Sequence, residues 1–108
     1  MESIRYKHRR PTHPGEILRE DVLPALEITQ ADFARKLGVS RQTVSELLRE
    51  KRPLSPDVAI RLARLVGGTP SGWLRMQQAV DLWEVEHSST KKYVGIKKLR
   101  AATDRKVG

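Results

Sequence analysis

The stretch TQADFARKLGVSRQTVSELLRE, residues 29–50, decides the fold of this chain. Phe33 and Leu37 lie one helical turn apart, which predicts a first helix with one apolar face. Gly38 can adopt a positive φ after the last helical residue, and Ser40 is a good N-cap for a second helix. Three further apolar residues form the inner face of that second helix: Val44, Leu47 and Leu48.

Two short helices joined by such a tight turn predict a helix-turn-helix, in which the N-terminal part of the second helix faces base edges in the DNA major groove. Gln42 could bond adenine through two atoms, and Arg41 could reach guanine or a phosphate. Glu46 could accept from cytosine or pair with Arg49 within the helix. The predicted DNA-contacting residues are Gln30, Ser40, Arg41, Gln42, Thr43, Ser45, Glu46, Arg49 and Lys51. The alternatives are a helical hairpin that only packs and, for each polar residue, plain solvent exposure.

Length and charge favour one domain with basic ends. The chain has 108 residues, no cysteine and a formal net charge of +8. Residues 15–85 carry equal numbers of acidic and basic side chains, residues 1–14 net +3, and residues 86–108 net +5. We therefore expect a basic N-terminal arm (1–12), a folded domain (13–87) and a basic, partly disordered C-terminal tail (88–108). The ends either contact phosphates or serve solubility. No apolar run could span a membrane or act as a secretory signal, so the expected compartment is the cytoplasm.

Cap and breaker residues predict an all-α fold of five helices. The first runs from residue 14 or 15 to about residue 23, where Pro24 ends it. Those of the helix-turn-helix cover about residues 29–37 and 41–49. The fourth begins at Ser55-Pro56-Asp57 and stops at Gly67-Gly68, and the fifth extends from Thr69-Pro70 to about Glu86. Within the tail, residues 93–96 could pair as a strand, or residues 96–102 could form a marginal helix, with disorder expected over about the last ten residues.

The fifth helix carries a stripe of Trp73, Met76, Val80 and Trp83. Its tryptophans are either core anchors or part of a dimer or partner interface. Catalysis is not expected, because His8, His13 and His87 are scattered and no serine lies in a strand-to-helix elbow. We predict no enzyme activity, no metal and no cofactor.

Several motifs of this chain resemble those of the HigA-type antitoxins within the lambda-repressor-like (Xre) helix-turn-helix class. They are HPGEIL (13–18), QADFA (30–34), SRQTVS (40–45), PLSPD (53–57), and Trp73-Leu74 with Gln77 and Asp81-Leu82. The resemblance implies a five-helix lambda-repressor-like fold and a homodimer that binds double-stranded operator DNA of its own operon. It also implies a HigB-like toxin partner, an mRNA endonuclease held inactive in the complex. In that picture Gln30 braces the DNA backbone, and Arg41, Gln42, Thr43 and Ser45 contact the operator.

Two points differ from the family pattern or leave it open. Glu50 stands where the family often has the glycine that ends the recognition helix, so this helix is expected to run on or to end less sharply. A basic toxin would need acidic patches, for example near Glu16, Glu20, Asp21 and Glu27, or apolar surface, and no toxin-binding residue is predicted. The alternative function is a stand-alone Xre-type repressor without a toxin.

Overall fold

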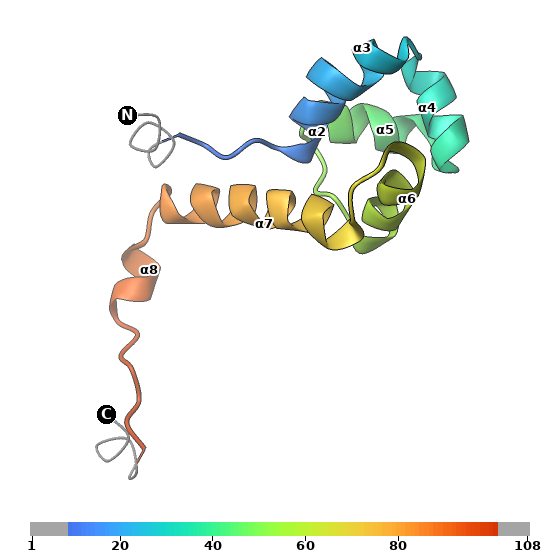
Figure 1. The fold of residues 1–108 in the computed structure, drawn as a ribbon. Coiled ribbons are helices and arrows are strands. Elements are labelled where there is room, and N and C mark those ends of the chain that lie inside the picture. Colours follow the sequence, from blue (N-terminus) through green and yellow to red (C-terminus); the bar gives the residue numbers. More distant parts are fainter. Residues whose placement is uncertain (1–8, 102–108) are drawn as a thin grey trace, which may run out of the picture.

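The computed structural model describes residues 9–101, and every regular element within them is a helix (Figure 1). The five predicted helices are present, the first of them divided into parts, and a short additional helix follows in the tail. The all-α prediction is therefore confirmed. Among these residues, no helix is both long and apolar enough to cross a membrane.

The first helical segment is longer than predicted. It consists of α2 (Pro14–Ile17), the π-helix η1 (Leu18–Val22) and α3 (Leu23–Leu26). The prediction that Pro24 ends it is wrong, because Pro24 lies inside α3 and the segment ends only at Glu27, which has a φ of 51°. A proline lacks an N–H and presses on the carbonyl four residues earlier. The preceding turn is widened, with the Leu23 N–H donating to the Leu18 carbonyl five residues back, and a widened turn can accommodate the ring.

The helix-turn-helix forms through the predicted caps. Its helices are α4 (Gln30–Leu37) and α5 (Arg41–Leu48). The Thr29 hydroxyl accepts from the Asp32 N–H at 3.1 Å and begins α4. Gly38 ends that helix with a φ of 78°, a left-handed conformation that glycine adopts without steric cost. The Ser40 hydroxyl then accepts from the Thr43 N–H at 3.0 Å and begins α5.

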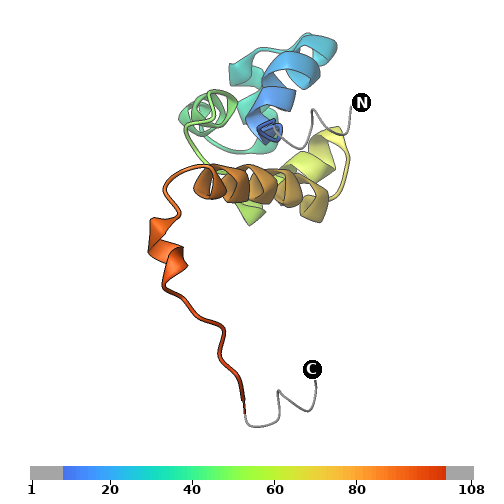
Figure 2. The ribbon, with the colours of Figure 1, turned by 90° about the vertical axis from the view of Figure 1, so that its left-hand side faces the viewer.

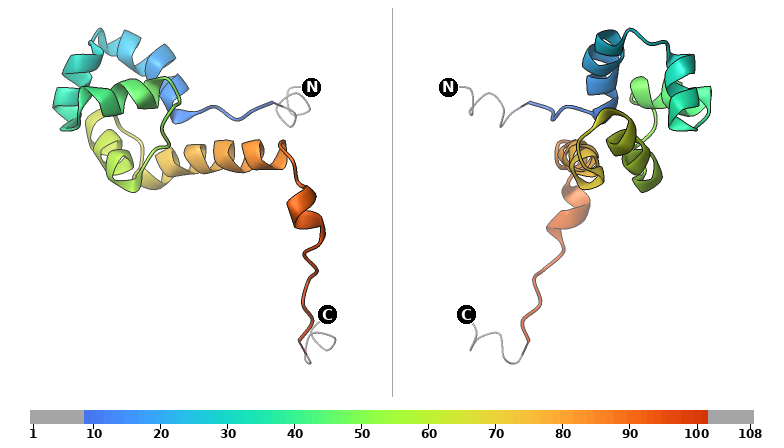
Figure 3. Two further views of the ribbon diagram at one scale, coloured as in Figure 1. Left: turned by 180° about the vertical axis from the view of Figure 1, so that it is seen from behind. Right: turned by 45° about the vertical axis from the view of Figure 1, so that its right-hand side comes forward.

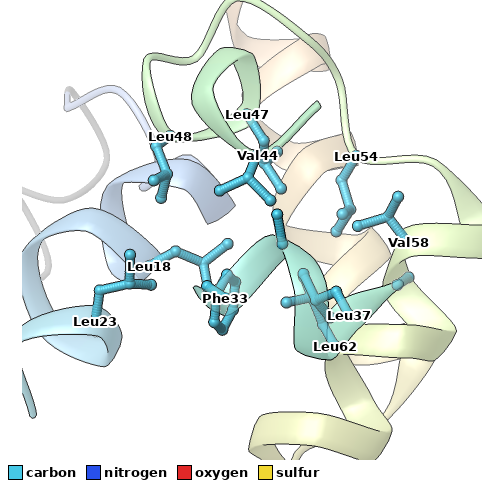
Figure 4. Packing of buried hydrophobic residues seen from close by; sticks show 12 residues of the cluster. Leu18, Leu23, Phe33, Leu37, Val44, Leu47, Leu48, Leu54, Val58 and Leu62 are labelled. Carbon is cyan, nitrogen blue, oxygen red and sulfur yellow. The ribbon is translucent and has the colours of Figure 1, made fainter. Parts of the chain in front are cut away.

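One hydrophobic core joins the first helical segment, the helix-turn-helix and α6 (Pro56–Val66) (Figure 4). Phe33 and Leu18 lie at its centre, and Leu62 closes it from α6. The inner face of α5 is buried as predicted, through Val44, Leu47 and Leu48. Each large apolar side chain that is fully buried contributes about 1.5–3 kcal/mol. The core therefore holds α5 by one face and leaves its other face outside.

The last long helix, α7 (Pro70–Glu86), begins and ends where the sequence predicts and extends beyond the bundle (Figures 1 and 3). Trp73 packs against the core, and its indole N–H donates to the Gly67 carbonyl at 2.9 Å. Trp83 lies outside the core and stacks on His87 with ring centroids 4.0 Å apart. The interpretation of the tryptophans as core anchors is therefore correct for Trp73 and not for Trp83. Between them, Val80 and Gln77 are buried.

The described part of the tail leaves the far end of α7 and lies apart from the bundle (Figure 2). It contains a single helical turn, α8 (Lys91–Val94), so the strand prediction for residues 93–96 is wrong. The alternative helix over 96–102 is also absent as far as residue 101. Val94 and Ile96 are 73% and 72% exposed, so too little apolar surface is buried there to stabilise a strand or a helix longer than this single turn. The disorder predicted for the last ten residues falls mainly on 102–108, outside the described residues.

Candidate DNA-binding surface

The outward face of α5 carries most of the predicted contact residues. Arg41 and Gln42 are exposed in the first turn, and Thr43, Ser45 and Glu46 are partly exposed. Seen from behind, α5 lies on the near side of the bundle, and neither the arm nor the tail crosses it as far as the structure describes them (Figure 3). The polar face is therefore accessible to a large partner.

Four of the predicted residues come together in one place. Gln30, Arg41, Gln42 and Ser45 line an open hollow of about 390 Å³ between the start of α4 and α5. Gln30 reaches it because it is the first residue of α4, where free backbone N–H groups and the helix dipole favour an anion. Residues from two helices thus form one surface with hydrogen-bond donors at its rim.

Ser40 and Thr43 have their side chains engaged within the helix start. The Ser40 hydroxyl caps the Thr43 N–H, and the two hydroxyl oxygens are 2.8 Å apart. A Ser40 side chain used in this way is a structural cap, so contact with a phosphate at this point would rely on backbone N–H groups.

Glu46 has different partners from those considered in the sequence. Its Oε2 accepts from the Gln42 amide nitrogen at 3.0 Å, and its Oε1 accepts from Arg52 Nε at 3.0 Å and Nη2 at 2.8 Å. Hydrogen bonds from Gln42 and from Arg52 hold the pKa of Glu46 below its ordinary value. Arg49 instead directs Nε at the Ser45 carbonyl, a long contact of 3.4 Å. The sequence places Arg52 just past the recognition helix but does not indicate it as a partner of Glu46, because it lies six residues further on and beyond the helix, where helical spacing carries no information.

Lys51 lies away from the hollow. It borders a second, polar pocket of about 320 Å³ between the α5–α6 loop and α7, which His13, Glu50 and Gln77 also line. Gln77 is buried there, and its amide oxygen accepts from the Leu54 N–H at 2.8 Å. The structure therefore separates Lys51 from the other predicted contacts.

The end of α5 is held by an ionic cluster. Glu50 has a φ of 60° and takes the left-handed conformation itself, so the helix ends sharply after Leu48, contrary to the expectation of a longer helix. Arg10 and Arg19 pair with its carboxylate at 3.0 and 3.3 Å, and Arg10 also pairs with Glu84 of α7 at 2.7 Å. Burial opposes ionisation of Glu50, but these hydrogen bonds outweigh it and lower its pKa. Arg10 is therefore held against the folded domain by its ion pairs with Glu50 and Glu84.

His13 caps the first helix beside this cluster. It is 3% exposed, and its Nδ1 accepts from the Gly15 N–H at 2.9 Å. Burial lowers the pKa of His13, while Arg10 acts in the same direction and the carboxylates of Glu50, Asp81 and Glu84 oppose it. The neutral ring is the form that can accept this hydrogen bond. In the described part of the chain, no group of three or more histidine, aspartate or glutamate side chains is arranged so that it could hold a metal ion.

Comparison with known proteins defines the class. A sequence model of the family described as helix-turn-helix matches residues 18–74. The chain belongs to this helix-turn-helix (Xre) family, which has the lambda-repressor-like fold. The family is non-enzymatic, as predicted for this chain.

Individual relatives are antitoxins and transcriptional regulators. Antitoxin HigA-1 of Vibrio cholerae is 42% identical over 84 residues, covering 78% of this chain and 79% of the relative. The Escherichia coli K12 regulator YbaQ, named an uncharacterised HTH-type transcriptional regulator, is 42% identical over 80 residues, covering 74% and 71%. The resemblance to HigA-type antitoxins is therefore confirmed by sequence comparison.

Two solved structures contain DNA. The Pseudomonas aeruginosa antitoxin HigA with the higBA promoter has a TM-score of 0.76 and 38% identity, covering 84% of this chain and all (100%) of that chain. Antitoxin GraA in complex with its operator has a TM-score of 0.77 and 39% identity, covering 86% and 95%.

Proposed function

We propose that this chain is a HigA-type antitoxin that binds the operator of its own operon and represses transcription. The carrying observation is the hollow formed by Gln30, Arg41, Gln42 and Ser45 on the free face of α5. The hollow lies on a fold similar to those of two antitoxins whose solved structures contain promoter or operator DNA. A helix so presented enters the major groove, with Arg41 and Gln42 at base edges and Gln30 at a phosphate. The cytoplasm, where the bacterial chromosome lies, is the compartment that this function requires.

The remaining predicted contacts are assigned by their surroundings. Ser45, which lines the hollow, and the partly exposed Thr43 take base or phosphate contacts, and Arg49, exposed just after α5, takes a phosphate. Lys51 contributes general electrostatic attraction to DNA because it lies apart from the hollow. Residues 13–87 act as the DNA-binding domain, flanked by the arm (1–12) and the tail (88–108). The exposed Lys91 and Lys92 of the tail support its attraction to polyanions.

The chain acts as a homodimer. In support, the outer face of α7 exposes the apolar side chains of Leu82 and Val85, at 57% and 41%. A symmetric dimer would place its two half-sites about 34 Å apart or at a multiple of that distance along the DNA. Light scattering of the purified chain, with Leu82→Lys as the variant, tests this assembly.

The protein partner is a HigB-like toxin. The similarity to antitoxin HigA-1 supports this partner, whereas the similarity to the regulator YbaQ favours the alternative of a repressor without a toxin. Co-expression with the neighbouring gene separates the two functions. A toxin that arrests growth alone, is relieved by this chain and copurifies with it supports the antitoxin. A neighbour that neither arrests growth nor copurifies supports the stand-alone repressor.

Operator binding is tested by a gel-shift assay with DNA from immediately upstream of the gene. The double variant Arg41→Ala with Gln42→Ala should weaken binding by at least about tenfold, since each good base contact contributes about 1–3 kcal/mol. The matched control removes the same residue types elsewhere, at the exposed Arg64 of α6 and Gln78 of α7, and should bind as the wild type does. Equal binding by the wild type and the α5 variant would refute operator recognition by this helix.

A further inference from the structure

The side chains of Gln42, Glu46 and Arg52 form a chain of hydrogen bonds along the edge of α5. Gln42 donates from Nε2 to Glu46 Oε2 at 3.0 Å. Arg52, in the loop after the helix, directs Nε and Nη2 at the other carboxylate oxygen of Glu46, at 3.0 and 2.8 Å. Both oxygens of Glu46 are therefore already hydrogen-bonded when Gln42 faces a partner.

This arrangement determines which way the Gln42 amide points. An amide has a donor end and an acceptor end of nearly equal shape, so an isolated glutamine can present either. An ionised carboxylate only accepts hydrogen bonds, and lone-pair repulsion opposes turning the Gln42 oxygen toward Glu46. A glutamate side chain is ordinarily ionised at neutral pH, and the hydrogen bonds from Gln42 and Arg52 lower the pKa of Glu46 further. Gln42 therefore keeps its oxygen and one N–H available on its outward side.

Arg52 makes this orientation possible. With side-chain exposures of 44% for Arg52 and 26% for Glu46, the ion pair lies at the surface and contributes little to stability. Near DNA, however, an uncompensated Glu46 carboxylate would be repelled by the phosphates, and this repulsion would turn it away from Gln42. Two donors from one guanidinium neutralise that charge and hold the carboxylate in place.

An amide held in this way matches one base. In the major groove adenine offers N7 as an acceptor and N6 as a donor, the pair that a glutamine amide complements. We propose that Glu46 and Arg52 are specificity-determining positioning residues, which hold Gln42 so that it selects adenine at one position of each operator half-site. This inference rests on the proposed operator binding. It replaces the direct contact of Glu46 with cytosine that the sequence suggested.

The test is selection from a pool of randomised DNA duplexes by the full-length chain, followed by sequencing of the bound DNA. The wild type should enrich a consensus sequence, and Gln42→Ala identifies the position at which Gln42 acts, because adenine preference is lost only there. Arg52→Ala should reduce adenine preference at that same position by about fivefold or more, the lower end of what a two-atom base contact discriminates. Arg52→Ala in the Gln42→Ala background should change the preference no further.

A second variant and a control separate positioning from general attraction. Glu46→Gln keeps the shape of the side chain but can both donate and accept, so it no longer orients Gln42 and should also relax the adenine preference. Lys51→Ala should lower affinity for all sequences alike without changing any preference. The circular dichroism spectrum of each variant verifies that it is folded.

The outcomes distinguish this inference from the proposed function. If the wild type enriches no sequence, operator recognition fails and the inference fails with it. If the wild type enriches a consensus but Arg52→Ala and Glu46→Gln preserve the same adenine preference, only the inference is overturned. A uniform loss of affinity in Arg52→Ala would make Arg52 a phosphate contact. A consensus that Gln42→Ala leaves unchanged would exclude base selection by Gln42.

Discussion

Replacing Gly15 with alanine tests how closely the first helix approaches the recognition helix. A Cβ at Gly15 would overlap the Leu47 carbonyl oxygen of α5 and would lie 3.0 Å from the Leu47 carbonyl carbon and 3.2 Å from His13 Nδ1. Those neighbours are helix backbone and a buried ring, neither of which can swing aside as a long side chain would. The substitution therefore forces α2 and α5 apart.

Two opposing terms decide the sign of the effect. Alanine in a helix is favoured over glycine by about 0.5–1 kcal/mol, so helix propensity alone predicts a more stable protein. Overpacking of a dense interior costs about 1–3 kcal/mol and occasionally more, and contact with backbone favours the upper end. We expect Gly15→Ala to lower the free energy of unfolding by about 2 kcal/mol. For a domain of this size that corresponds to a fall in Tm of about 8–16 °C.

The measurement is urea unfolding followed by far-ultraviolet circular dichroism, with linear extrapolation to water. Gly95→Ala is the matched control, because its backbone φ is −78° and a Cβ there would meet nothing within 4 Å. Its free energy of unfolding should stay within about 0.5 kcal/mol of the wild type. A Gly15→Ala protein as stable as the wild type, or more stable, would refute the close approach of these two helices.

Substitutions at three further positions test the polar contacts around α7 and the end of α5. Burial lowers the pKa of His13 below its ordinary 6.5, so the native state binds fewer protons than the unfolded chain; stability is therefore full above pH 6.5 and falls as the pH drops through the lowered value. His13→Asn keeps a capping side chain that does not titrate, so the melting temperature should change less between pH 7 and about 5. If the melting temperature of the variant depends on pH as strongly as that of the wild type, His13 is not the source of that dependence. Gln77→Ala leaves the buried Leu54 N–H without its acceptor and should lower the free energy of unfolding in urea by about 1–3 kcal/mol. An unchanged free energy of unfolding would contradict a stabilising role of that hydrogen bond. Glu50→Ala and Glu50→Gly both lose the ion pairs of Glu50, but only glycine takes its left-handed backbone conformation without strain. The glycine variant should therefore be about 1 kcal/mol more stable than the alanine variant. Equal unfolding midpoints of the two variants would contradict backbone strain at this residue.

The local structure of this chain could be predicted because it depends on neighbours in the sequence. Thr29, Ser40 and Ser55 cap helices through N–H groups three residues away, and Gly38 takes its left-handed conformation at the end of α4. The buried face of α5 followed from the spacing of its apolar residues. Propensity, capping and helical periodicity act over a few residues, so these features did not require the tertiary structure.

Tertiary structure decided the features that depend on distant residues. Pro24 lies inside a helix because the turn before it widens, and Glu50 ends α5 in a left-handed conformation where Arg10 and Arg19 meet its carboxylate. The partners of Glu46 depended on where the loop after α5 directs Arg52. Gln30 lies beside α5 only because the turn between α4 and α5 folds the two helices against each other, and this arrangement creates the hollow. Charged side chains can pair with any opposite charge within reach, and only the folded backbone determines which charges come within that reach.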